Sequence, residues 1–210
     1  FNCTAIDRNA AAPTGSGVFC KRLNMKRWIL IGLIVIALLA VAFTMSRKEI
    51  AMAGLKDVSD RLPRNPAKSY GKRSLDDIDR IIIHHSATHG GDPWAYARYH
   101  IGTRGWPGIG YHFVIQPDGT VYQTNALDTI SYHTSGENTR SVGICLTGNF
   151  DEQEPTEEQI RQLIKLCQKL YKKTGRRLSI HGHNEFSAKS CPGAAIDVNE
   201  IEQFVNQITA

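Results

Sequence analysis

A histidine and a cysteine stand eight positions apart near the C-terminus, and they constrain the fold strongly. Residues 182–193 read GHNEFSAKSCPG, so His183 and Cys191 frame a segment that also contains Lys189. Imidazole and thiolate together suit zinc, and a catalytic zinc usually has three protein ligands and one open position. A third ligand must therefore come from elsewhere, and the fold must bring a distant part of the chain to this segment.

An apolar run about a hundred residues upstream offers that ligand. Residues 81–86 read IIIHHS, a β-branched stretch that is typical of a buried strand and ends in His84 and His85. Successive side chains of a strand point to opposite faces, so only one of the two histidines can readily reach the metal. Neither segment is specific alone, because a cysteine such as Cys191 is often simply a small core residue.

The residues between these two segments predict alternating strands and helices. Residues 111–116 and 120–124 flank Pro117, Asp118 and Gly119, which favour the turn of a hairpin. Residues 141–147, SVGICLT, indicate another buried strand. Helices are expected at 93–101, from a capping box at Thr156 to a stop at Gly175, and after residue 197. The predicted fold is an α/β domain with a mixed central β-sheet flanked by helices.

Four of these motifs, in this order, resemble one family. They are the strand that ends in histidine, the run GYHF at 110–113, the run SVGI at 141–144, and the Gly-His and Lys-x-Cys-Pro elements at 182–192. The chain resembles the zinc-dependent N-acetylmuramoyl-L-alanine amidases, which include phage amidase-type lysozymes (endolysins), bacterial wall amidases and peptidoglycan recognition proteins. The likeness spans about residues 76–210. It implies the same mixed α/β fold, a zinc cofactor, and hydrolysis of the amide between the N-acetylmuramoyl lactyl group and L-alanine of the peptidoglycan stem peptide.

The resemblance also implies roles for individual residues. It makes His84, His183 and Cys191 the zinc ligands. It places Tyr111 and Lys189 beside the metal as catalytic groups, one to handle the proton of the attacking water and the other to stabilise the developing oxyanion. A domain that only binds peptidoglycan is the alternative, and such members of the family usually lack the cysteine ligand.

Other histidines keep the assignment open at two points. His85 replaces His84 as the ligand if the two strand faces are reversed, and His181 is a lesser competitor of His183. His133 is a candidate substrate contact, because family members often carry a histidine near this position at the edge of the cleft. His112 follows Tyr111 on a strand, and we expect it to be a hydrogen-bonded core histidine.

The N-terminal part of the chain has a different character. Residues 28–45 contain no charge and are long enough to span a hydrocarbon layer of about 30 Å, so they predict a transmembrane anchor. We expect a disordered segment at 1–27, where Met25 is a candidate start, a linker at 46–75 and the zinc amidase domain at 76–210. Cleavage after Ala53 is the alternative and would give a secreted enzyme.

Charge and cysteine content limit the partners. Residues 1–70 have a net charge of +7 and residues 71–210 a net charge of −2, so the domain lacks the cationic footprint of a nucleic-acid-binding protein. The five cysteines imply no disulfide framework. We expect a monomer that binds peptidoglycan or muropeptide, held at a membrane by its N-terminal helix with the catalytic domain outside the cytoplasm. Wall remodelling and phage lysis both stay open as roles.

Overall fold

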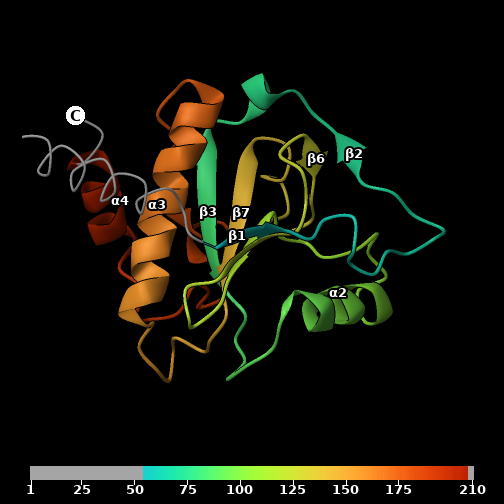
Figure 1. Ribbon diagram of the computed structural model, residues 1–210, viewed down its shortest axis with the longest axis horizontal. Helices are drawn as coiled ribbons and strands as arrows, with labels where there is room; N and C mark the ends of the chain where they lie inside the picture. Colours follow the sequence, from blue (N-terminus) through green and yellow to red (C-terminus); the bar gives the residue numbers. More distant parts are fainter. Residues whose placement is uncertain (1–53, 208–210) are drawn as a thin grey trace, which may run out of the picture. The chain divides into compact units, whose positions relative to one another are not determined.

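The computed structural model describes residues 54–207 and contains a six-stranded mixed sheet with helices on both sides (Figure 1). The sheet order is β1-β5-β4-β7-β3-β8, with strands β1 (Leu55–Asp57), β3 (Arg80–His85), β4 (Phe113–Ile115), β5 (Val121–Gln123), β7 (Ser141–Leu146) and β8 (Ser179–Gly182). A small second sheet pairs β2 (Gly71–Lys72) with β6 (Thr129–Ile130). The helices are α2 (Pro93–Gly102), α3 (Glu157–Thr174) and α4 (Val198–Gln207), with short 3-10 helices η1 (Leu75–Asp77) and η2 (His183–Glu185). The predicted mixed α/β fold is confirmed.

Strand β3 lies in the parallel part of the sheet and pairs with both β7 and β8. Its three isoleucines are fully buried, as a parallel strand covered on both faces requires. Strands β4 and β5 form the predicted antiparallel hairpin. The amide of Gly119 donates to the carbonyl of Gln116 at 2.9 Å, and the φ angle of +82° at Gly119 is one that glycine adopts without strain.

The two faces of the sheet bury different sets of side chains. Helices α3 and α4 lie on one side of the sheet in Figure 1 and α2 on the other. The α3 side holds the larger apolar cluster, which includes Ile81, Ile83, Val142, Ile144, Leu163, Leu166 and Leu170. The α2 side holds a smaller cluster, which includes Ala97, Ile109, Val114 and Cys145. Alternation along β7 sends Ile144 to the first cluster and Cys145 to the second.

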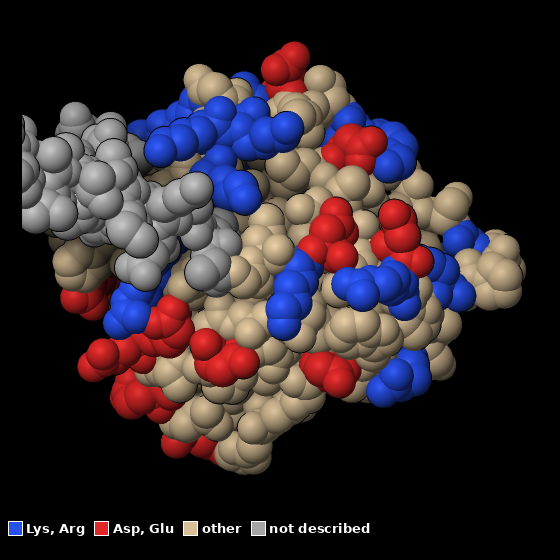
Figure 2. Space-filling model, viewed as in Figure 1, with Lys and Arg blue, Asp and Glu red and all other residues tan. Residues whose placement is uncertain are grey.

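Helix α3 has the start and stop signals that its sequence predicts. The Thr156 hydroxyl accepts from the amide of Gln159 at 3.1 Å, and the Gln159 side chain accepts from the amide of Thr156 at 3.1 Å. Gly175 ends the helix with φ of +69°. Glutamates occupy its first turn and lysines its last, which suits the helix dipole. Figure 2 accordingly shows acidic and basic side chains gathered near opposite ends of the helix.

The predicted linker at 46–75 is wrong for residues 54–75, which belong to the folded domain. Strand β1 pairs in parallel with β5 at the edge of the main sheet. Val58 and Leu62 are buried, and the Arg73 side chain is buried as well. The Arg73 guanidinium donates to the carbonyls of Asn138 and Ser141, at 2.9 and 2.7 Å. The charged, proline-containing composition of this segment did not predict the packing. The packing depends on a few isolated apolar residues and one buried arginine.

Within residues 54–207, none of the helices has the length and apolar character needed to cross a membrane. The predicted transmembrane anchor at 28–45 lies outside the described residues. The same holds for the predicted N-terminal segment at 1–27 and for residues 46–53 of the predicted linker.

Candidate metal centre

The two histidines at the end of β3 serve opposite faces of the sheet. Both are nearly inaccessible to solvent. His85 Nδ1 accepts a hydrogen bond from the amide of Phe150 at 3.2 Å, and Phe150 belongs to the cluster on the α3 side. His84 points the other way, and its Nδ1 lies 3.7 Å from Sγ of Cys191. His84 is therefore the histidine of this pair that approaches the other candidate ligands.

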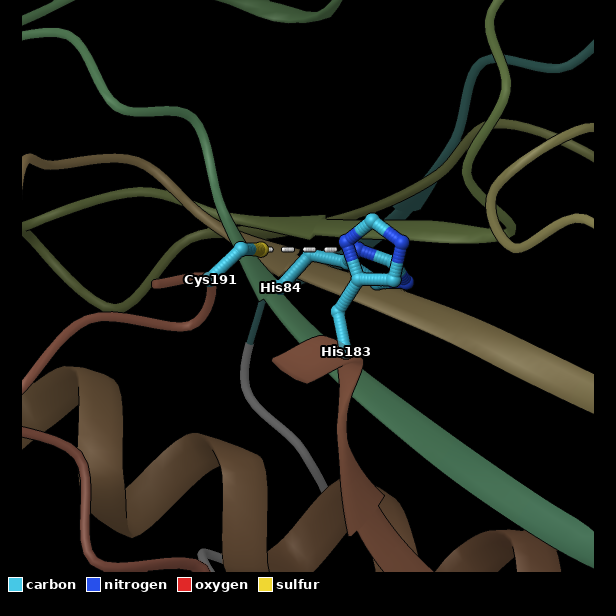
Figure 3. Close-up of side chains that lie close together, drawn as sticks. All are labelled: His84, His183 and Cys191. Carbon is cyan, nitrogen blue, oxygen red and sulfur yellow. Dashed lines mark hydrogen bonds between the residues drawn. The ribbon is translucent and has the colours of Figure 1, made fainter. Parts of the chain in front are cut away.

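The sheet and one loop bring the three candidate ligands together. Because β8 runs parallel to β3, with Gly182 opposite Ile83, the end of β8 delivers His183 next to His84. The loop that carries Cys191 folds back on η2, where the amide of Asn184 donates to the carbonyl of Cys191 at 2.6 Å. The donor atoms of His84, His183 and Cys191 all lie within 4.8 Å of one another. Figure 3 shows the three side chains converging from these separate elements.

The geometry of this group suits a zinc ion. Zinc bonds of about 2.0 Å to nitrogen and about 2.3 Å to sulfur, at a tetrahedral angle, place the two donor atoms about 3.5 Å apart. The separation of 3.7 Å between His84 Nδ1 and Cys191 Sγ is close to this value. Two imidazoles and one thiolate also form a donor set that zinc prefers and that leaves a fourth position open. Among residues 54–207, this is the one group of histidine, cysteine or acidic side chains with metal-binding spacing.

Burial and nearby charges favour the metal-binding form of both histidines. Burial, followed by the neighbouring His133 and His183, lowers the pKa of His84 well below its usual value. Burial and the positive charge of Lys189 lower the pKa of His183. Both imidazoles are therefore neutral near pH 7, as metal ligation requires. Burial raises the pKa of the Cys191 thiol to about 11, so a bound cation has to displace its proton.

Tyr111 and Lys189 lie at the same site. The ring centroids of Tyr111 and His84 are 5.4 Å apart. Burial, then the neighbouring Cys145 and Cys191, raises the pKa of Tyr111 well above its usual value, so its hydroxyl keeps its proton. Lys189 is exposed on the loop two positions before Cys191, and its charge contributes to lowering the pKa of His183. Both side chains line the same cleft as the three candidate ligands.

The cleft has a volume of about 1340 Å³ and extends from the ligand group toward α2. Part of its wall consists of aromatic and basic side chains from α2 and the loops that follow: Tyr96, Tyr99, His100, Arg104, Trp106 and Tyr132. Sequence analysis did not identify these residues. Arg104 and Trp106 lie between the predicted helix at 93–101 and the predicted strand at 111–116, where a tryptophan among glycines was the available signal.

His133 lies directly against His84. It is 7% exposed, and its Nδ1 is 3.2 Å from Nε2 of His84. Burial lowers the pKa of His133 to about 3, so the ring is neutral. The predicted contact with substrate stays a prediction, although His133 is one of the residues that line the cleft.

Two further histidines have other partners. His112 is fully buried, and its Nε2 lies 2.9 Å from the carbonyl of Thr129, which agrees with the predicted core histidine. His181 Nδ1 lies 2.7 Å from a carboxylate oxygen of Glu185, and His181 is not part of the three-donor group.

The mixed α/β sheet gathers two histidines and a cysteine at a cleft where its parallel strands end, an arrangement that could hold a metal ion. The chain belongs to the N-acetylmuramoyl-L-alanine amidase family, whose model matches residues 74–194. It is 33% identical to the human N-acetylmuramoyl-L-alanine amidase over 102 residues, which are 47% of this chain and 18% of the human protein. The chain spans less than two thirds of the length of the curated relatives it matches.

Solved structures support the same placement. The endolysin amidase LysCS from Clostridium intestinale aligns with a TM-score of 0.65 and 29% identity, covering 74% of this chain and 97% of LysCS. A complex of the peptidoglycan recognition proteins LCa and LCx with bound tracheal cytotoxin aligns with a TM-score of 0.64 and 26% identity, covering 71% of this chain and 95% of that one. The chain is therefore similar both to proteins named amidases and to proteins named recognition proteins.

Proposed function

We propose that this chain is a zinc-dependent amidase that cleaves the bond between the N-acetylmuramoyl lactyl group and L-alanine of the peptidoglycan stem peptide. The observation that carries the proposal is the group of His84, His183 and Cys191, whose donor atoms lie within 4.8 Å of one another at a large cleft. Family membership supports the reaction class. The presence of the cysteine favours catalysis over binding alone.

The three side chains supply what a zinc ion needs. His84 and His183 would offer neutral nitrogens and Cys191 a thiolate. Bound there, zinc would lower the pKa of a water molecule to about 7 and polarise the amide carbonyl of the substrate.

Two residues beside this group have the chemistry for the remaining tasks. Lys189 is a cation on the cleft wall, and we assign it the stabilisation of negative charge that develops on the substrate carbonyl oxygen. Tyr111 keeps its hydroxyl proton. It can therefore donate a hydrogen bond that orients the attacking water, or donate a proton to the substrate carbonyl oxygen. The aromatic wall formed by Tyr99, Trp106 and Tyr132 would hold the sugar and peptide of the substrate in the cleft.

A peptidoglycan-binding module without activity is the second candidate function. The likeness to recognition proteins in a complex with tracheal cytotoxin favours it. The same aromatic cleft could bind peptidoglycan in both cases. The two functions differ in whether a metal bound at His84, His183 and Cys191 supports hydrolysis.

One assay separates the two functions. Purified full-length chain is incubated with peptidoglycan, and new L-alanine amino termini are counted together with zinc per chain. We expect about one zinc per chain, release of stem peptides, loss of release on chelation and recovery when zinc is restored. Tight binding of peptidoglycan without release would instead identify the binding module. Full activity in a metal-free preparation would overturn the role of zinc.

We also propose that residues 28–45 anchor the chain in a membrane, with the domain on the side where peptidoglycan lies. The length and uncharged character of that segment support this proposal. The chain should stay with membranes after washing at high salt and high pH. Recovery of soluble protein that begins at Gly54 would instead establish cleavage after Ala53 and a secreted enzyme.

A further inference from the structure

A chain of four polar groups leads away from the candidate metal centre into the protein. His84 Nε2 lies 3.2 Å from His133 Nδ1, and His133 Nε2 lies 3.2 Å from the hydroxyl of Ser141. The Ser141 hydroxyl donates to the backbone carbonyl of Glu137 at 2.6 Å. All three side chains are buried, so these groups have few alternative partners.

The carbonyl at the far end fixes the direction of every hydrogen bond in the chain. A carbonyl only accepts, so the single hydroxyl proton of Ser141 is committed to Glu137 and the Ser141 oxygen must accept from His133. His133 therefore carries its proton on Nε2 and has a lone pair on Nδ1. His84 must then donate from its own Nε2, which leaves a lone pair on His84 Nδ1. That nitrogen is the one facing Cys191.

The protein is shaped to hold the His133 ring at this place. Gly143 of β7 lies against the ring, and a Cβ atom at Gly143 would lie 2.5 Å from His133 Cγ. The side chain of Asn138 accepts hydrogen bonds from the backbone amides of His133 and Thr134, at 3.0 and 2.8 Å. The position of the His133 ring thus depends on the absence of a side chain at Gly143 and on the hydrogen bonds by which Asn138 holds the loop that carries His133.

We propose that His133 is a positioning residue for the metal centre, which accepts the Nε2 proton of His84 and so presents His84 Nδ1 to the ion. This inference rests on the proposed role of His84 as a metal ligand. Histidine ligands generally donate their second ring N–H to a fixed acceptor, which sets the tautomer and orients the ring. Here that acceptor would be a second histidine, and Ser141 and Glu137 would hold it in the matching tautomer.

The hydroxyl of Thr134 is the competing acceptor. Its Oγ1 lies 3.4 Å from His84 Nε2, a longer contact than that made by His133, and 3.1 Å from His133 Nδ1. Either acceptor requires the same proton on His84. The variant Thr134→Val removes this hydroxyl and keeps the shape of the side chain, so it separates the two.

The test compares His133→Asn with His133→Gln in the full-length chain. The amide oxygen of asparagine can take the place of Nδ1, whereas that of glutamine reaches the place of Nε2 and leaves His84 without its acceptor. Zinc affinity is measured by competition with a chelator, and the melting temperature is recorded for each variant. We expect His133→Gln to bind zinc about 10- to 100-fold more weakly than the wild type, and His133→Asn and Thr134→Val to retain most of the affinity.

A second measurement needs no metal. The ¹⁵N shifts of the His84 ring in the zinc-free chain report its tautomer, and we expect the Nε2-protonated form in the wild type and a mixture in His133→Gln. Equal zinc affinity for the asparagine and glutamine variants, or the Nδ1-protonated form in the wild type, would overturn the inference. A wild-type chain that shows the expected tautomer but binds no zinc would instead refute the proposed function and leave His133 as a partner of His84 alone.

Discussion

The two faces of the central sheet differ in the side chains they bury. Neighbouring residues of one strand point to opposite faces. On β3, Ile83 packs into the apolar cluster below α3, and His84 turns to the opposite face and meets His183 and Cys191. The α3 face buries mostly aliphatic side chains. The other face buries histidines close to the cleft and partly buries Tyr111. Stability and chemistry can therefore be altered separately on the same sheet.

Each face also has a hollow, and the contrast shows what identifies a site. On the α3 side, a hollow of about 740 Å³ is lined by Leu55, Phe113, Leu166 and Leu170, with lysines at its rim. The cleft on the other side brings together the three candidate metal donors and side chains that can move protons. Both faces have a hollow large enough for a ligand. Between these two hollows, the cleft is the one that also contains candidate metal donors and groups for proton transfer.

Replacement of a proposed metal ligand should have the largest effect on activity and should distinguish the two faces of the sheet most clearly. In Cys191→Ser a neutral hydroxyl replaces the thiolate, so we expect loss of zinc and a fall in amidase activity of more than about 10³-fold, beyond what loss of a single oxyanion donor causes. The melting temperature of the metal-free protein should change little. Metal analysis, peptide release and thermal unfolding check these outcomes. Undiminished zinc affinity in the variant would exclude ligation by Cys191.

Loss of the cleft groups should come next. We expect Lys189→Ala to lower kcat by about 10²- to 10³-fold, the range for removal of one oxyanion donor, with zinc content and muropeptide affinity nearly unchanged. Tyr111→Phe keeps the ring, so a loss of similar kind would assign the effect to the hydroxyl. Single-turnover cleavage of a muramoyl peptide, with zinc content measured for each variant, tests both roles. Wild-type rates in both variants would contradict them.

A core residue on the α3 face should show the opposite pattern. Leu166 is 1% exposed, and Leu166→Ala should lower the free energy of unfolding by about 2–5 kcal/mol through lost burial and a cavity. Zinc affinity and kcat of the remaining folded protein should match the wild type. Denaturant unfolding and single-turnover kinetics make the comparison. A large fall in kcat would mean that the two faces are coupled after all.

The helix cap should give the smallest effect. Thr156→Ala removes the acceptor for the amide of Gln159 and should cost about 1 kcal/mol in stability. Thr156→Ser is the matched control, because it keeps the hydroxyl. Denaturant unfolding of the two variants measures the difference, and equal stability would show that the capping hydrogen bond contributes little here.

Local patterns in the sequence were enough for much of the fold. The isoleucine run predicted β3, the Pro-Asp-Gly turn predicted the β4–β5 hairpin, and the capping box at Thr156 predicted the start of α3. These elements follow from signals within a few residues of one another. The candidate ligands His84, His183 and Cys191 were assigned through the resemblance of four ordered motifs to one family, because neither the strand nor the C-terminal segment is specific alone.

Other features depend on contacts between distant residues and had no local signal. Residues 54–75 read as a linker, because the pairing of β1 with β5 and the burial of Arg73 involve partners more than fifty residues away. The contact of His133 with His84 joins residues 49 positions apart through side chains alone. The cleft wall likewise combines residues of α2 with residues of several loops. No periodic pattern in the sequence predicts that these segments lie together.

Gly143 has a consequence for anyone who would redesign this protein. Propensity-guided stabilisation would exchange a glycine inside a buried strand for a residue that forms strands more readily, with an expected gain from the stiffer unfolded chain. At this position the first added carbon would collide with the ring of His133. A stabilising algorithm that scores the backbone alone would thus remove the space that the His133 ring occupies beside His84. On the proposed assignment, engineering for heat tolerance and binding of zinc oppose each other at Gly143.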